Sequence, residues 1–233
     1  NRFTGAGWDG RGLSAAARPL EGTRVVYVDR RLWEAWEAVP FLVPEQENVL
    51  RIQPRSPEPM ERADQFLLLL WPHGDLKPHL AALPRSAMIE PDVGPLTRGD
   101  LESEPYPAYA AYAVTPQVPS TAPTVARFGD ILSLTDYRID VSDGGDRSTY
   151  LVQLNWRAEQ VPTAEYTAFV CVCDGRCTAD TVLAQDDAQP GLTYYPTTLW
   201  RPGDVVVDTR TLHLSAAAPT TPTVGVGLYA WPT

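Results

Sequence analysis

The stretch "YYPTTLWRPGDVVVDTRTLHL", Tyr194 to Leu214, carries the clearest structural pattern in the chain. It begins as a loop with three large aromatic side chains, continues through an Arg-Pro-Gly-Asp turn, and ends in alternating apolar and polar residues. Pro and Gly together favour a turn, and a period of two is typical of a strand with one buried face. The stretch therefore predicts a strand of a β-sheet, preceded by an aromatic loop.

The rest of the second half repeats this alternating pattern. Apolar and polar residues alternate in six segments, 131–139, 149–158, 166–173, 181–187, 204–214 and 223–231. Gly, Pro and Asp turns separate these segments, and no helical periodicity interrupts them. Six or more strands in about 110 residues predict an antiparallel β-sandwich of jelly-roll or immunoglobulin-like type.

The first half shows a different pattern of apolar residues. Strand-like segments at 23–29, 48–52, 64–72 and 86–92 are interrupted by helical patterns, one of which places Trp33 and Trp36 on a single face. This order predicts a small Rossmann-like α/β unit with a largely parallel sheet. The junction after the first strand contains no glycine, so the sequence disfavours dinucleotide binding there. The stretch 102–124 is rich in Pro, Tyr, Ala and Ser, and its middle, "AYAAYAV" at 108–114, predicts a strand that closes the first domain. Its end reads as a stiff linker, which predicts domains at 1–120 and 121–233.

Composition narrows the function classes. The formal charge is -10 at pH 7, with no cluster of Lys and Arg, so nucleic acid and anionic lipid surfaces are poor partners. The chain begins with Asn1 and carries no signal peptide, which leads us to expect a processed chain or a piece of a longer protein.

All three cysteines lie in "CVCDGRC", Cys171 to Cys177. Cys173 and Cys177 flank an Asp-Gly-Arg turn, so they would face each other across a hairpin and can form a disulfide. A metal site is the alternative, but the spacing lacks the second ligand pair that is typical of zinc sites. The sequence leaves a disulfide or buried thiols as the interpretation, with no metal and no cofactor expected.

Several motifs of the second half occur in a fixed order: "FGDILSLTDYRID", a strand ending in Trp156, "YTAFV", "YPTTLW", "RPGD" and "VGLY". From Arg127 to Trp231 this order resembles the C-terminal soluble β-domain of bacterial membrane proteins of the family 39 glycosyltransferase type, which are related to protein mannosyltransferases. The first half is similar, less sharply, to the α/β segment after the last membrane span. The three cysteines depart from the family pattern.

The resemblance implies a parent protein that transfers a lipid-linked sugar on the outer face of a membrane. It also implies that this chain is extracytoplasmic and is tethered through an N-terminal transmembrane region outside the given sequence. The catalytic acid of the family lies among the membrane spans, so no catalytic residue is carried over to this chain. The implied partners are a glycan or protein acceptor and the membrane-embedded part of the parent chain.

Two candidate sites arise from the residues themselves. Tyr194, Tyr195 and Trp200 would offer a sugar platform, with Arg201 and Asp186 bonding hydroxyls, or they would simply seal one end of the sandwich.

The acid-rich turn at Asp140, Asp143 and Asp146 is a weak calcium candidate, since no bidentate acid completes it. Asp186 and Asp187 are adjacent in a strand and would point to opposite faces, which excludes a glycosidase pair.

The sequence therefore predicts a non-catalytic extracytoplasmic module that supports the membrane part or recognises glycan or acceptor. The alternative is a free-standing carbohydrate-binding or cell-surface adhesion protein. An enzyme in its own right ranks last.

Overall fold

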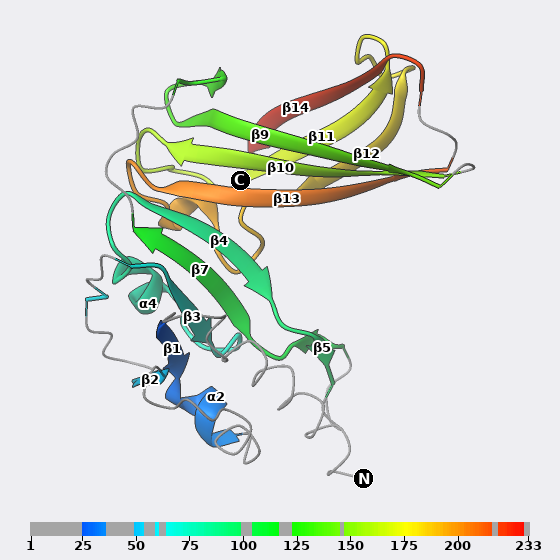
Figure 1. Ribbon diagram of the computed structural model, residues 1–233. Helices are drawn as coiled ribbons and strands as arrows, with labels where there is room; N and C mark the ends of the chain where they lie inside the picture. Colours follow the sequence, from blue (N-terminus) through cyan, green and yellow to red (C-terminus); the bar gives the residue numbers. More distant parts are fainter. Residues whose placement is uncertain are drawn as a thin grey trace. The chain divides into compact units, whose positions relative to one another are not determined.

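The computed structural model describes residues 25–35, 49–53, 59–60, 64–98, 104–116, 123–144, 147–215 and 219–230. The chain divides into two units, unit 1 at Asn1–Val118 and unit 2 at Pro119–Thr233. Figure 1 shows the strands and helices of both. Of the described residues, 55% lie in strands and 8% in helices, so the protein is mostly β.

Unit 1 contains a mixed sheet with the strand order β2-β1-β3-β7-β4. The central parallel part joins β1 (Val25–Asp29) to β2 (Val49–Ile52) and to β3 (Phe66–Leu70). On the other side of β3, β7 (Ala110–Pro116) runs antiparallel to both β3 and β4 (Ala87–Val93). A separate two-stranded ladder pairs β5 (Leu96–Thr97) with β6 (Tyr106–Pro107).

Two short α-helices accompany this sheet within the described residues, α2 (Arg30–Ala35) and α4 (Lys77–Ala81). Asp29 ends β1, and its Oδ1 accepts the Arg31 N–H at the start of α2 at 2.9 Å, as a capping side chain does. Trp33 is buried with Val26, Val28 and Leu69 in the core cluster of this unit. Trp36, its predicted partner on the same face, lies outside the described residues.

The predicted fold class, a Rossmann-like α/β unit followed by a β-sandwich, is wrong. A Rossmann-like unit needs long helices that cross over between parallel strands and cover both sheet faces. The two helices have six and five residues, and β7 enters antiparallel between β3 and β4. The alanine-rich segment around Tyr112 fills this central position, because small side chains and a buried ring suit a strand that is covered on both faces.

Unit 2 consists of two antiparallel sheets. The first has the order β13-β10-β9-β8 and the second the order β12-β11-β14. The strand bounds are β8 Ala126–Phe128, β9 Leu132–Asp143, β10 Ser148–Ala158, β11 Tyr166–Asp174, β12 Val182–Ala188, β13 Val205–Leu214 and β14 Pro222–Ala230. All six segments predicted as strands in this half are confirmed as strands. The two sheets are compatible with a β-sandwich.

The core of unit 2 lies where the inner faces of these sheets meet. Val152, Leu154 and Trp156 alternate along β10 and are buried, and Ala168 and Val170 do the same on β11. This is the period of two expected for strands with one buried face. No helix in the described part of the chain is long and apolar enough to span a membrane.

Candidate functional site

The aromatic loop predicted as a ligand platform lies largely in the protein interior. Tyr195 and Trp200 are both 0% exposed, and the Trp200 Nε1–H donates a 3.0 Å hydrogen bond to the Tyr195 carbonyl. Tyr194 is half-buried, and burial raises the pKa of its hydroxyl. A sugar stacks on an exposed ring face. Two of the three rings present no such face, and a ligand role for this loop stays a prediction.

The residues around Trp200 explain the Pro-Thr-x-x-Trp motif in structural terms. The loop forms a short 3-10 helix, η2 (Thr197–Leu199). The buried Thr197 hydroxyl accepts the Tyr166 N–H at 3.0 Å and donates to the Ala164 carbonyl at 3.0 Å. One threonine thus satisfies two backbone groups that precede and begin β11.

The Arg-Pro-Gly-Asp turn is closed by its own ion pair. The Arg201 Nε lies 3.0 Å from the Asp204 carboxylate, which is fully buried. The Arg201 N–H donates to the same carboxylate at 3.1 Å. Gly203 has a φ of 88°, a conformation that favours glycine. These contacts fix the conformation of the turn that leads into β13.

Asp186 takes part in a different network, which joins the two sheets of unit 2. Arg210 on β13 donates to Asp186 on β12 at 2.9 Å and to the Ala188 carbonyl at 3.0 Å. The same guanidinium binds the buried Asp208 with Nε at 2.7 Å and Nη2 at 3.1 Å, and Trp156 Nε1 donates to Asp208 at 3.3 Å. Arg210 is buried and bonds several acceptors, so it holds the two sheets together and has a structural role.

The predicted ligand residues are therefore distributed over separate interactions. Asp186 pairs with Arg210, whereas Arg201 pairs with Asp204. Asp187 bonds the Gln185 amide at 2.9 Å on the other face of β12. The opposite orientation of Asp186 and Asp187 agrees with the expectation that they cannot flank one scissile bond.

The calcium candidates are also spread out. Asp140 is exposed and pairs with Arg138 at 2.8 Å, while Asp143 accepts a hydrogen bond from the Ser148 hydroxyl at 3.4 Å. Both lie on β9 at an odd spacing, which directs their side chains to opposite faces. Asp146 lies outside the described residues. A calcium role stays a prediction.

The cysteines form a tight group on β11 and the turn after it. Cys173 and Cys177 are joined by a disulfide, with their Cα atoms 5.3 Å apart. Cys171 keeps a buried thiol 3.6 Å from the Cys173 sulfur. Burial raises the pKa of this thiol, a backbone hydrogen bond at Gly225 lowers it, and the charge of Asp187 raises it further. The thiol is therefore protonated at neutral pH.

A further feature of unit 2 is an apolar strip on the inner face of β9. Tyr137, Ile139 and Val141 pair with the buried inner residues of β10, so they point toward the opposite sheet. They are nevertheless 53%, 36% and 50% exposed. We call Tyr137, Ile139 and Val141 the β9 strip. It is apolar surface in a position where a sandwich normally has core.

The β9 strip is exposed because the two sheets differ in width. Unit 2 contributes four strands to the first sheet, and the second sheet has three. In the second sheet, β11 and β12 contact β13. The second sheet ends at β14, and the β9 strip beyond this edge stays exposed. One additional strand beside β14 would cover the β9 strip.

A groove follows this gap between the sheets. One part, of about 430 Å³, is lined by Tyr137 and Ile139 of β9 and by Val224 and Val226 of β14. A second part, of about 410 Å³, lies toward the start of β9. Phe128 lines both parts, so they adjoin. We call the two together the inter-sheet groove.

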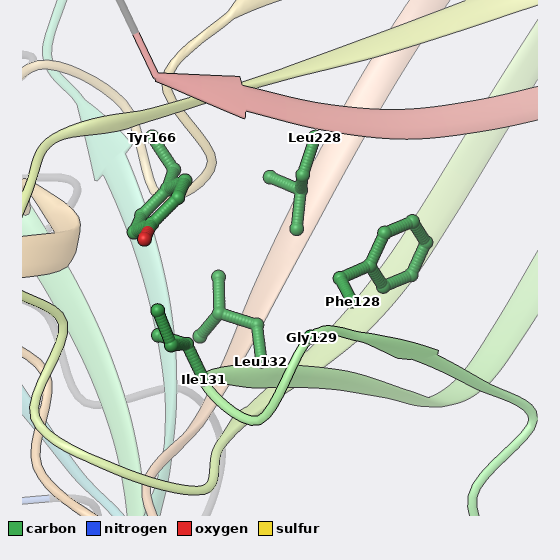
Figure 2. A pocket seen from close by; sticks show the side chains of 6 residues that line it. All are labelled: Phe128, Gly129, Ile131, Leu132, Tyr166 and Leu228. Carbon is green, nitrogen blue, oxygen red and sulfur yellow. The ribbon is translucent and has the colours of Figure 1, made fainter.

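Figure 2 shows the second part of the groove. Leu228 on β14 and Tyr166 on β11 reach in from the second sheet. Phe128 at the end of β8, Ile131 in the turn that follows and Leu132 at the start of β9 line the opposite side. Gly129 makes this turn with a φ of 59°, which explains the glycine of the Phe-Gly-Asp motif.

Both strands that border the groove have an edge without a strand partner in the described part of the structure. β8 pairs with β9 only as far as Leu134, so β9 is open on that side from Thr135 to Asp143. β14 is the last strand of its sheet. Open edges present rows of backbone N–H and C=O groups that can pair with another strand.

The sequence contained part of the signal for this groove. "TDYRIDVSD" alternates as a strand does, and its apolar positions are those of the β9 strip. The pattern predicts a buried face, but it cannot show that the opposite sheet is one strand too narrow. The exposure therefore became visible only in the structure.

Comparisons with known proteins gave no relative: no protein-family model, no curated protein and no solved structure matches this chain.

Proposed function

We propose that this chain is a non-catalytic, extracytoplasmic module of a membrane-bound glycosyltransferase-like protein, and that it recognises an extended segment of the protein acceptor. The ordered motifs from Arg127 to Trp231, which resemble the β-domain of family 39 glycosyltransferases, support the first part. The single observation that carries the second part is the exposed β9 strip beside an open strand edge.

An extended peptide matches both chemical features of the groove. Its backbone can pair with the open N–H and C=O groups of β9 or β14, and alternate side chains can cover the β9 strip. A peptide strand rises about 3.3 Å per residue, so a segment of about nine residues matches β9 from Thr135 to Asp143. The groove thus fits one added strand.

Sugar recognition fits this groove less well. Its described lining is mostly aliphatic and aromatic, with Thr223 among the few hydroxyl-bearing residues. Sugar hydroxyls that are buried against such a lining would lose hydrogen bonds to water without replacement. The carbohydrate-binding alternative would instead use the Tyr194–Trp200 loop, and two of its rings are buried.

The negative charge of the chain favours peptides with basic residues. The net charge is -10, and Asp136, Asp140 and Asp143 lie along β9 with Arg138. An acidic surface attracts basic partners and accelerates their association at low salt. We therefore expect the bound segment to carry alternating apolar residues with Lys or Arg between or beside them.

A selection from a random nine-residue peptide library tests this proposal. The best binder is synthesised and its affinity is measured for the wild type, for Val141→Asn on the inner face of β9, and for Ser142→Asn on the outer face. The pair introduces the same side chain at neighbouring positions. Loss of one apolar contact of about 1.4 kcal/mol corresponds to a tenfold weaker affinity. We expect that loss for Val141→Asn and little change for Ser142→Asn; equal affinities for both variants would contradict the proposal.

N-methylated versions of the same peptide separate strand addition from ordinary apolar binding. Methylation removes a backbone donor while it leaves the side chains in place. In an added strand, every second N–H of the peptide points to the edge of the protein sheet, and the others point to solvent. Methylation of the N–H groups that point to the protein should therefore abolish binding, and methylation of the alternate series should not. Equal binding of both series would contradict strand addition.

A further inference from the structure

The three sulfur atoms on the outer face of the second sheet form a group that the groove does not use. Cys171 and Cys173 are two residues apart on β11, so they share the face opposite to the buried Val170 and Val172. The ligand atoms of Cys171, Cys173 and Cys177 all lie within 4.8 Å of one another.

The fold leaves room for this group at Gly225. Gly225 on β14 lies directly opposite Cys171 in the β11–β14 register. A Cβ at Gly225 would lie 2.8 Å from the Cys171 sulfur and 3.1 Å from the Cys177 sulfur. The sulfurs thus converge over a position that has no side chain, and Cys177, which is only half-buried, gives access from solvent.

The position of Cys171 disfavours exchange between its thiol and the disulfide. Attack on a disulfide proceeds through a thiolate in line with the S–S bond, and an in-line sulfur would be about 2 Å closer to one sulfur than to the other. The Cys171 sulfur is 3.6 Å from Cys173 and 4.0 Å from Cys177, so it lies beside the bond. The three sulfurs form a triangle rather than a line.

This triangle has the dimensions of a three-thiolate metal site. Metal–thiolate bonds of about 2.3 Å place three sulfurs around one cation about 4 Å apart. The two contacts of Cys171 already have this length. Only the Cys173–Cys177 edge must open, and it does so when the disulfide is reduced.

We propose that the reduced chain binds one copper(I) ion through Cys171, Cys173 and Cys177. Thiolates select soft cations such as copper(I) and zinc. Structural zinc takes four ligands, and among the described residues the close group contains three sulfurs and no fourth ligand. Three thiolates alone therefore favour copper(I).

The site is gated by redox state. A dithiol reductant transfers two electrons and two protons to the Cys173–Cys177 bond and becomes a disulfide itself, which leaves two thiols on the protein. Copper(I) then displaces the protons of the three thiols as it binds. In the disulfide form only one thiol remains, so the ligand set is incomplete.

An anaerobic titration with copper(I) against a competing chelator tests the proposal on the full chain. The protein is reduced with a dithiol, freed of reductant, and checked for its folded circular dichroism spectrum. We expect one copper(I) per reduced chain with three sulfur neighbours by X-ray absorption, and affinity at least a hundredfold lower for the disulfide form.

Two variants remove one ligand each. Cys171→Ser keeps the disulfide pair, and Cys177→Ser alters the half-buried position. Changes outside the ligand set already weaken metal sites by ten- to a hundredfold, so loss of a ligand should cost at least about a hundredfold. Unchanged affinity in either folded variant, unfolding of the reduced wild type, or equal copper(I) binding by the disulfide form would each overturn the proposal.

Discussion

The Arg210 guanidinium on β13 lies 2.9 Å from the Asp186 carboxylate on β12, and this ion pair joins the two sheets of unit 2. Arg210 is buried and also binds Asp208, which is buried itself. Removal of the arginine would leave the Asp208 charge without its partner in the interior. We expect Arg210→Met to lower the free energy of unfolding by about 3–5 kcal/mol, as measured by urea denaturation.

Asp186→Asn is the matched control for that variant. Asp186 is 42% exposed, so its charge is partly solvated, and asparagine can still accept a hydrogen bond. The expected loss is about 1 kcal/mol or less. Equal losses for the two variants would show that the buried Asp208 does not depend on Arg210.

Trp200 tests whether the aromatic loop is interior structure. The side chain is fully buried and its Nε1 is bonded to the Tyr195 carbonyl. We expect Trp200→Ala to destabilise the chain by about 3–5 kcal/mol, because truncation of a buried aromatic ring leaves a cavity. A Trp200→Ala variant that unfolds at the wild-type urea concentration would mean that the loop is not packed as described.

The pH dependence of stability has one identifiable source in Glu159. A hydrogen bond from the Ser133 hydroxyl lowers the pKa of this carboxyl below its ordinary value of 4.5, and the Arg157 guanidinium at 2.7 Å lowers it further. Because the folded pKa lies below the unfolded one, the charged carboxylate stabilises the fold above about pH 4.5. That contribution is lost as the pH falls through the folded pKa.

Glu159→Gln should therefore lower the free energy of unfolding by about 1 kcal/mol at neutral pH, and it should have no effect at a pH below the folded pKa of Glu159. Thermal unfolding of both proteins from pH 7 to pH 3 measures this difference. The two melting temperatures should converge as the pH falls. Parallel curves over the whole range would refute the assignment to Glu159.

The cysteine group predicts a specific pattern of chemical reactivity. The Cys171 thiol is buried and its pKa is raised by burial, so the native chain should react slowly with an alkylating reagent at pH 8 and rapidly after unfolding. The disulfide closes a loop between residues only four apart in sequence. Its reduction should cost about 2 kcal/mol of stability, measured by urea unfolding with and without a dithiol. Rapid alkylation of the native chain would place Cys171 at the surface.

Local sequence patterns predicted local structure well. The six strands of the second half follow from alternation, because each has one face in the core and one face outward, as β10 shows with Val152, Leu154 and Trp156. The turns follow from residues that tolerate a positive φ, such as Gly129 and Gly203. These features depend on neighbours in sequence, and so the sequence carries them.

The arrangement of unit 1 was not predictable in the same way. The helical patterns between the strand-like segments were expected to belong to a Rossmann-like unit, but α2 and α4 are too short to be the crossover helices of such a unit. The antiparallel insertion of β7 between β3 and β4 depends on pairings with β3 between residues at least forty positions apart in sequence. No local periodicity encodes such a choice.

The burial of the candidate site residues also could not be predicted from local sequence. Tyr195 and Trp200 were candidates because large aromatics suit both cores and sugar platforms, and only burial distinguishes the two. The alternation along the β9 strip is that of a strand with one buried face. The exposure of the β9 strip depends on the width of the opposite sheet, which is a property of the whole unit.

Hydrogen exchange of the β9 amides tests the central claim most directly. The library-selected peptide is added to the full chain, and exchange is compared with that of the free chain for residues 135–143. If the peptide adds as a strand at the open edge of β9, exchange there should slow markedly, while β12, which lies at the other edge of its sheet, should not change. Tight peptide binding without protection of β9, or of β14 across the groove, would contradict the account.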